Sequence, residues 1–411
     1  MTENPLEKLE NYSKLSTSIF NKIFGDGYSE KIILPKGLAL IVLYFIILAV
    51  MYFNGIYQNR KNLLNIITLT MILSILFQIT IAFIGRFLGN DNEIIAAHEI
   101  IEKFYKEEGK KSENLSTLNS IMDNAMKTLN IYLIISFMFY NIHTITSFIV
   151  SYIKGEFIMS FNIYFPYIDQ NTLYGYFFNM SILTIAGVLF WFLVGSRECH
   201  FIFYSMQVIS MVNILRKKFE NFDKKIKKLH EIVENQSGSS DQQFQSIIAK
   251  VISENRVKMK VATFEKEIIH LINEFEVLEQ YKQHCFKYNK NVSFIALSAN
   301  SIAIGLSLLY TRLVSIAIGL SLALLFFFQV LLYCLVGAIV SEQNEKLLQT
   351  VYDFPWYELS PKFGKIYMQF IHQCQNAISF DLPILGTLDL ELFTNFIKAS
   401  YSYMNYLFKF I

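Results

Sequence analysis

Six long stretches without a formal charge restrict what this sequence can fold into. Leu38–Phe53 is sixteen apolar residues without a break. Five further stretches contain no Asp, Glu, Lys or Arg: Leu63–Gly85, Thr128–Ile153, Leu173–Ser196, Val292–Thr311 and Leu313–Ser341. A helix needs about 20 such residues to cross the hydrocarbon core, where its backbone must satisfy its own hydrogen bonds. The sequence therefore predicts six membrane-spanning helices.

The closing stretch, Thr387–Phe410, predicts a seventh span of a different kind. It is long enough to cross a bilayer, at about 1.5 Å per residue, but it carries Lys398 and Lys409 among many aromatic residues. An ionisable group at membrane depth usually faces protein or water rather than lipid. The composition agrees with a membrane protein, because 53% of the chain is hydrophobic and only 17% is charged.

The distribution of basic residues predicts the orientation. With a cytosolic N-terminus and seven spans, 27 of the 36 Lys and Arg residues fall in inside segments, 5 fall outside and 4 lie in or beside the spans. The inside segments are those before Gly37 and at 86–127, 216–283 and 342–365. The positive-inside rule then places the C-terminus outside the cell. The first 36 residues are polar, so no cleavable signal peptide is expected.

The inside segments combine charges with apolar residues at helical spacing, so we expect them to form helices outside the membrane. Residues 91–129 read as one amphipathic helix leading into the third span, and 264–286 repeats apolar positions every three or four residues. In 341–380, turns are expected at "FPW" and "SPK". Such faces need partner helices, so a cytosolic helical anchor bundle is predicted.

The predicted fold class is an all-α membrane protein with seven transmembrane helices and this anchor bundle. The expected divisions are a cytosolic segment 1–36, spans one to six with their cytosolic loops in 37–340, an anchor helix region 341–383 and the seventh span in 384–411.

No enzyme motif is present in the sequence, and no catalytic residue, metal ligand or cofactor is predicted. The sequence has no GxSxG, Walker or HExxH motif, and no basic aromatic motif that would indicate nucleic-acid binding. Intramembrane acids, which a proton relay or ion-coupled transporter needs, are lacking from the six firm spans. These spans could line a mostly apolar cavity for a small hydrophobic molecule. The intramembrane His143 fits either a helix–helix hydrogen bond or such a pocket.

The last span carries a polar stripe on an aromatic helix. Lys398, Ser402, Asn405 and Lys409 recur at steps of three or four residues. A helix of this kind suits a water-filled path that bulky apolar residues can close.

At these residues the chain resembles the insect odorant receptor family. The family's closing Ser-Tyr-Ser-Tyr pattern stands here in "LDLELFTNFIKASYSYMNYLF", and "FPWYELSPKFGKIYMQFIHQCQNAISF" is similar to the family's cytosolic turn and following helix. The resemblance implies a tetrameric odorant-gated cation channel of the plasma membrane, in sensory neuron dendrites, with seventh helices around a central pore. It implies Tyr406, Lys409 and Phe410 at the narrow outer part of this pore. It also implies an odorant pocket in the outer half of the bilayer, for which we expect Leu73, Phe77, Tyr140, His143, Ser147, Phe178 and Met180.

The loop 216–283 is too short for the family's co-receptor members, so the chain resembles an odorant-specific tuning subunit. Four copies of Lys409 around a narrow path would repel cations, whereas one beside three co-receptor subunits is tolerable. The expected partners are therefore co-receptor subunits, a small volatile ligand and the lipid bilayer, and not nucleic acid.

Two alternatives remain at this point. An insect gustatory receptor shares the architecture, although its terminal motif usually contains a Gln that "SYSYMNYLFKF" lacks. A G-protein-coupled receptor would have its N-terminus outside, which conflicts with the basic residues of the predicted inside segments.

Overall fold

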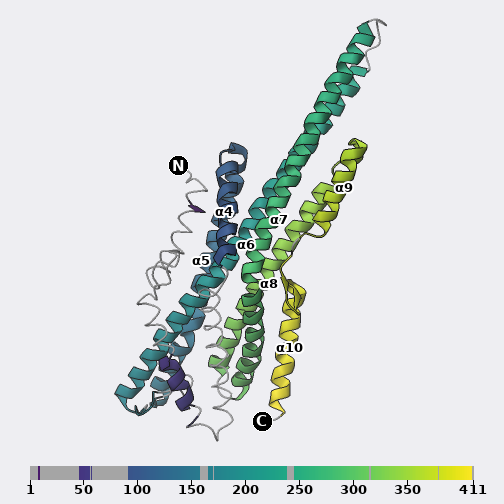
Figure 1. Cartoon of the computed structure of the whole chain (residues 1–411). Coiled ribbons are helices and arrows are strands. Elements are labelled where there is room, and N and C mark those ends of the chain that lie inside the picture. The colour runs from purple at the N-terminus through teal and green to yellow at the C-terminus, as the bar shows by residue number, and fades with distance from the viewer. Residues whose placement is uncertain are drawn as a thin grey trace.

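The fold is described from a computed structural model. It covers residues 8–9, 46–55, 57, 91–157, 165–169, 171–237, 245–313, 316–377 and 379–409. Over these residues the chain consists of helices, the turns and short connections between them, and one hairpin of two short strands. Figure 1 shows the long helices side by side, with α10 running along the C-terminal part of α7 toward the end of the molecule where the C-terminus lies. The helical architecture follows from the uncharged stretches, which satisfy their backbone hydrogen bonds internally.

Helices α4 (Asp91–Glu108) and α5 (Ser112–Lys154) are separate, so the prediction of one helix through 91–129 is wrong. A turn at Gly109–Lys111 divides them, in which the amide of Lys111 donates to the carbonyl of Glu108. The side chain of Asn114 reaches back to the Glu108 carboxylate at 2.6 Å, which stabilises this turn. Helix α5 ends at Gly155, whose φ of 66° lies in the left-handed region that glycine adopts easily.

Helices α6 (Leu173–Ser237) and α7 (Gln245–Leu313) are 65 and 69 residues long. Each contains a predicted span and continues without interruption into a predicted inside segment. Together they form a hairpin that projects beyond the other helices in Figure 1. At about 1.5 Å per residue, each helix is roughly three times as long as a hydrocarbon core is thick.

The C-terminal third contains α8 (Ile316–Tyr352), the 3-10 helix η1 (Trp356–Glu358), α9 (Pro361–Gln375) and α10 (Leu390–Phe408). The predicted turns at "FPW" and "SPK" lie on either side of η1. Strands β1 (Asp381–Leu382) and β2 (Gly386–Thr387) pair antiparallel between α9 and α10, with Asp381 opposite Thr387. This hairpin, which was not predicted from the sequence, separates the end of α9 from the start of α10.

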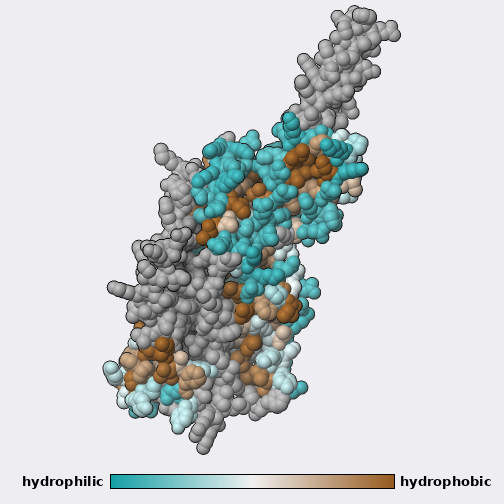
Figure 2. Space-filling model, viewed as in Figure 1, coloured by the Kyte–Doolittle hydropathy of each residue, from teal (hydrophilic) through white to brown (hydrophobic). Residues whose placement is uncertain are grey.

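Exposed apolar side chains mark the surface that suits lipid. Along α5, the exposed residues Ile131, Ile134, Met138, Ile145 and Ile149 follow helical spacing. Among the described helices, Phe264–Leu313 and Gly319–Tyr352 are long and apolar enough to cross a membrane. Figure 2 shows mainly hydrophilic side chains over the part that holds α4 and α9, and hydrophobic patches toward the opposite end. This division suits a molecule that is partly inside and partly outside a bilayer.

Aromatic side chains connect the helices in the hydrophilic part. Phe222 of α6 stacks on Phe354, just after α8, with ring centroids 5.4 Å apart. Phe370 of α9 contacts Phe219 of α6 and Phe275 of α7 at 5.7 and 5.2 Å. The four segments that contribute these rings come from different parts of the sequence, so burial of their apolar faces holds α6, α7, α9 and the end of α8 together.

Candidate functional site

The candidate ligand residues with described side chains lie near the start of α6. Phe178 is half-buried and packs against Phe165 and Tyr174, with ring centroids 6.1 Å from each. Met180 is only 1% exposed and packs with Tyr176 and Leu183. Leu73 and Phe77 lie outside the described residues.

Tyr140, His143 and Ser147 lie on one face of α5, because they are three and four residues apart. The structure describes the helix at these positions but not the three side chains. Contacts from neighbouring residues show which element this part of α5 meets. Phe148 lies against Tyr176 of α6 at 5.8 Å between ring centroids, and the Ser151 hydroxyl is 3.1 Å from the Tyr176 hydroxyl. The predicted positions on α5 and α6 therefore belong to neighbouring helices.

Two further anchoring contacts in this region were not predicted. Asn179 accepts a hydrogen bond from the Phe165 amide at 2.7 Å and donates to the Gly175 carbonyl at 2.8 Å, which fastens the segment before α6 to the helix. Trp191 donates to the Ser136 hydroxyl at 3.0 Å and so joins α6 to α5 deeper in the bundle. Trp191 is one of only two tryptophans, and a buried indole N–H needs a partner, which was the available sequence signal.

Helix α10 has one packed face and one exposed polar face. Its packed face contains Leu392, Phe396 and Ser400. The Ser400 hydroxyl lies 3.0 Å from the Ser301 carbonyl of α7 and 3.2 Å from the Ser301 hydroxyl. The close approach of α7 and α10 is also visible at Gly305, where a Cβ would stand 3.1 Å from the Ser400 carbonyl oxygen.

The predicted polar stripe lies away from this packed face. Lys398, Ser402 and Lys409 are exposed, and Asn405 is half-buried. Tyr406, one of the predicted pore residues, is 61% exposed, whereas Phe410 lies outside the described residues. A single subunit thus leaves the polar side of α10 uncovered by α7 or α8. The assignment of Tyr406, Lys409 and Phe410 to a pore stays a prediction.

A contact between an arginine of α7 and a phenylalanine of α10 fixes the last turn of α10, and it was not predicted from the sequence. The Arg312 guanidinium carbon lies 3.8 Å from the centroid of the Phe408 ring, which is a cation–π arrangement. Arg312 and Phe408 stand at the ends of their helices, so the contact connects the two ends directly.

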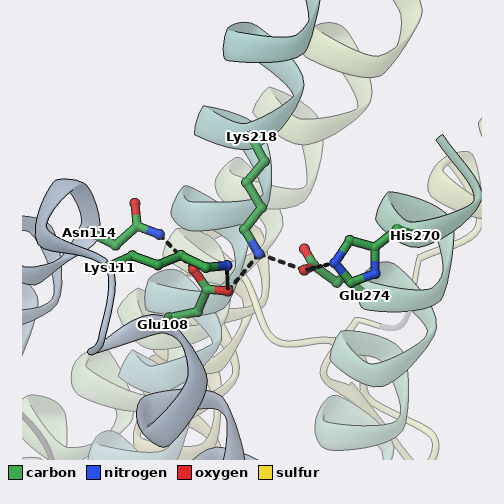
Figure 3. Close-up of polar contacts among 6 residues, drawn as sticks. All are labelled: Glu108, Lys111, Asn114, Lys218, His270 and Glu274. Carbon is green, nitrogen blue, oxygen red and sulfur yellow. Dashed lines mark hydrogen bonds and ion pairs between the residues drawn. The ribbon is translucent and has the colours of Figure 1, made fainter. Parts of the chain in front are cut away.

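A network of ion pairs joins three elements in the hydrophilic part (Figure 3). Lys218 of α6 donates to Glu108 of α4 at 2.8 Å and to Glu274 of α7 at 2.6 Å. Lys111 donates to Glu108 at 2.7 Å, and His270 lies 3.2 Å from Glu274. Burial of Glu108 opposes its ionisation, but the hydrogen bonds from Lys111 and Lys218 outweigh burial and lower its pKa.

A second group connects α4 to α7. Glu93 accepts from His284 at 2.6 Å and also pairs with Lys287. The hydrogen bonds from Lys287 and His284 lower the pKa of Glu93.

Lys282 of α7 has no exposed side-chain area, and it pairs with Glu279 and donates to Asn344 of α8 at 2.9 Å. Burial lowers the pKa of Lys282, which shows that its charge is held at a desolvation cost.

Comparisons with known proteins give a family and a fold. The sequence profile of the family described as "7tm Odorant receptor" matches residues 87–401. The insect olfactory receptor OR5 from Machilis hrabei has a similar structure, with a TM-score of 0.69 at 13% identity over 98% of both chains. The same receptor in complex with eugenol gives a TM-score of 0.62 at 13% identity over 99% of this chain and 100% of the other. No curated protein sequence matches this chain.

Proposed function

Because this chain belongs to the insect odorant receptor family, whose members are receptor channels rather than enzymes, we propose that it is the odorant-binding subunit of an odorant-gated cation channel. The observation that carries the proposal is the polar face of α10, which a single subunit leaves uncovered. The rival reading as a gustatory receptor is less favoured, because the terminal motif of such receptors usually contains a Gln that "SYSYMNYLFKF" lacks. A G-protein-coupled receptor would have its N-terminus outside the cell, which conflicts with the basic residues of the predicted inside segments.

The odorant pocket is proposed to lie among the second to sixth spans, which include those of α5 and α6, in the outer half of the membrane. The proposed lining residues are Leu73, Phe77, Tyr140, His143, Ser147, Phe178 and Met180. Support comes from the Phe148–Tyr176 and Ser151–Tyr176 contacts, which bring the helices that carry five of these residues together. The similar fold of a receptor solved in complex with eugenol supports a small organic ligand. Apolar pockets discriminate weakly, by about 1–3 kcal/mol per methylene, so a volatile hydrophobic molecule is the class expected.

The pore is proposed to be lined by α10 from four subunits around a central axis. Lys398, Ser402 and Lys409 are exposed on one side of α10, while Leu392, Phe396 and Ser400 pack against the same subunit. A polar stripe that its own subunit leaves open suits a water-filled path shared between subunits. Tyr406, Lys409 and Phe410 are proposed for its narrow outer part.

The proposed orientation has a cytosolic N-terminus and an extracellular C-terminus in the plasma membrane. The basic residues of the inside segments support it. In this orientation the ion-pair network around Glu108 and the aromatic contacts of Phe370 lie in the cytosol, as parts of the anchor bundle. The anchor bundle would then hold together the cytosolic ends of α6 and α7.

The subunit is proposed to assemble with co-receptor subunits. Lys409 is exposed at the end of α10, and a ring of four such charges would repel cations from a narrow path. Replacing most copies with a co-receptor subunit removes most of this repulsion.

The decisive test is two-electrode recording from oocytes that express this chain with and without an insect co-receptor, challenged with a panel of volatile odorants. Odorant-evoked cation current only in the paired condition supports the proposal. Current from this chain alone would show a homotetramer and refute the argument from Lys409. No odorant response in either condition, with surface expression verified, would count against the receptor function.

The pocket is tested with a matched pair of substitutions. Tyr176→Phe removes only the hydroxyl that meets Ser151 between α5 and α6, so the odorant EC50 is expected to change. Tyr352→Phe makes the same change at a tyrosine that is 62% exposed at the end of α8 and serves as the control. Equal EC50 values for both variants and the wild type would argue against a pocket at this position.

A further inference from the structure

Ser360 has a sequence context that no other serine or threonine in the chain shares. The chain contains six prolines, and Ser360 is the only serine or threonine that directly precedes one. A Ser-Pro pair is the minimal recognition element of proline-directed protein kinases, and the proline ring also restricts the serine to an extended backbone. The sequence therefore offers such a kinase one possible acceptor.

The structure presents this pair in a suitable conformation. Ser360 has φ −57° and ψ 150°, an extended backbone, and lies in the short connection between η1 and α9. Pro361 and Lys362 are exposed, and Ser360 is half-buried. The acceptor thus stands at the surface of the molecule, beside a turn rather than within a helix.

The Ser360 hydroxyl makes a bond that a phosphate cannot keep. It donates to the Glu265 carboxylate of α7 at 2.7 Å. Ser360 is also the N-cap residue of α9, but its side chain makes no hydrogen bond to the amides of the first turn. The hydroxyl therefore ties α9 to α7 and leaves the usual capping role unused.

We propose that Ser360 is a phosphorylation site for a proline-directed serine/threonine kinase, and that its modification exchanges the α9–α7 tie for a cap on α9. In the transfer, Ser360 Oγ bonds to the γ-phosphorus of ATP while the bond to the β–γ bridging oxygen breaks. The products are phosphoserine and ADP, and the hydroxyl proton is released. The inference rests on the proposed orientation, which puts this turn in the cytosol with ATP.

The direction of the exchange follows from charge. A phosphate carries about −1.5 to −2 charges and can no longer donate to Glu265, so the two groups repel. The first-turn amides of α9 and the exposed Lys362 offer the phosphate donors and positive potential instead. Since α9 leads through the β1–β2 hairpin into α10, the change acts on the element that precedes the proposed pore helix.

The first test is phosphorylation of the purified full chain by a recombinant proline-directed kinase with ATP, followed by mass spectrometry. Roughly one phosphate per chain is expected, on Ser360. Ser360→Ala should lose it, and the matched Ser360→Thr variant should keep it. Lack of phosphate on Ser360 in the folded wild type, with a synthetic 355–367 peptide modified under the same conditions, would overturn the proposal. So would modification confined to other residues.

The second test measures the exchange of partners without requiring channel activity. Hydrogen–deuterium exchange of the phosphorylated chain should slow in the first turn of α9 and accelerate around Glu265, each by about threefold or more. Glu265→Lys, which replaces repulsion by attraction, should abolish the acceleration. Unchanged exchange at both places would refute the switch. Because these readouts need no current, they fail independently of the proposed channel function.

Discussion

A methyl group added at Gly337 of α8 should disturb the start of α10, because the backbone of Leu388 lies directly against this glycine. A Cβ at Gly337 would stand 2.2 Å from the Leu388 carbonyl oxygen and 2.6 Å from the Leu388 Cβ. The obstacle is mainly backbone, which cannot rotate away as a long side chain can. Gly337→Ala therefore forces α8 and the segment before α10 apart by about 1 Å, judged from ordinary contact distances.

Hydrogen bonds hold the backbone on both sides of Leu388, so moving this residue away from α8 would weaken them. Its amide donates to the Phe380 carbonyl at 2.8 Å, and the following residue, Asp389, caps α10 by accepting from the Leu392 amide at 2.7 Å. Overpacking typically costs 1–3 kcal/mol, and loss of a cap adds about 1 kcal/mol. The better helix propensity of Ala returns about 1 kcal/mol. The expected net loss of stability is about 1–3 kcal/mol.

The assay is thermal unfolding of the purified receptor in detergent, paired with odorant dose–response recording beside a co-receptor. Gly364→Ala on α9 is the matched control, because no atom lies within 4 Å of its Cβ position. Gly305→Ala, at 3.1 Å from the Ser400 carbonyl oxygen, should fall between the two. If Gly337→Ala unfolds at the same temperature as Gly364→Ala and gates normally, the packing argument is wrong.

Three further predictions concern charged groups. The pKa of Glu108 is lowered from 4.5, so the stability that its ionised form gives the folded protein is complete above pH 4.5 and is lost as pH falls through the lowered pKa. Glu108→Gln should therefore make Tm depend less on pH on the acid side, and an unchanged Tm–pH curve would contradict this. Arg312→Gln should remove about 0.5–1 kcal/mol of the contact that joins Phe408 to α7, changing the odorant EC50 roughly two- to fivefold, and an unchanged EC50 would refute it. Lys282→Met should leave Glu279 without its buried partner and lower Tm, unless Glu279→Gln is added as well; an equal Tm for the single and double variants would oppose this reasoning.

The sequence was sufficient for the features that depend on local composition. The uncharged stretches around His143 and Ser147 predicted helices that the structure contains in α5. The steps between Lys398 and Ser402 predicted a polar side of α10, and both residues are exposed there. Helical periodicity and charge are properties of neighbouring residues, so they can be read without a structure.

Features that depend on tertiary partners could not be predicted in this way. The turn at Gly109 stands in a charged stretch that suits a helix equally well, and the Asn114 contact to Glu108 that stabilises it appears only in the structure. Lys218 was one of several basic residues in a run, and its position between Glu108 and Glu274 depends on how three helices pack. The hairpin before α10 depends on the burial of Leu388 against α8.

Because α7 is uninterrupted, the directions in which two of its distant side chains point around the helix axis are fixed relative to each other. Phe275 faces Phe370 of α9 near one part of this helix, and Ser301 faces Ser400 of α10 farther along. One inserted residue between them would turn the second contact by about 100° relative to the first and move it by about 1.5 Å. Phe275 and Ser301 could then no longer contact Phe370 and Ser400 at the same time. Changes in chain length should therefore be tolerated in the connection between α6 and α7 but not between Phe275 and Ser301, even at exposed positions.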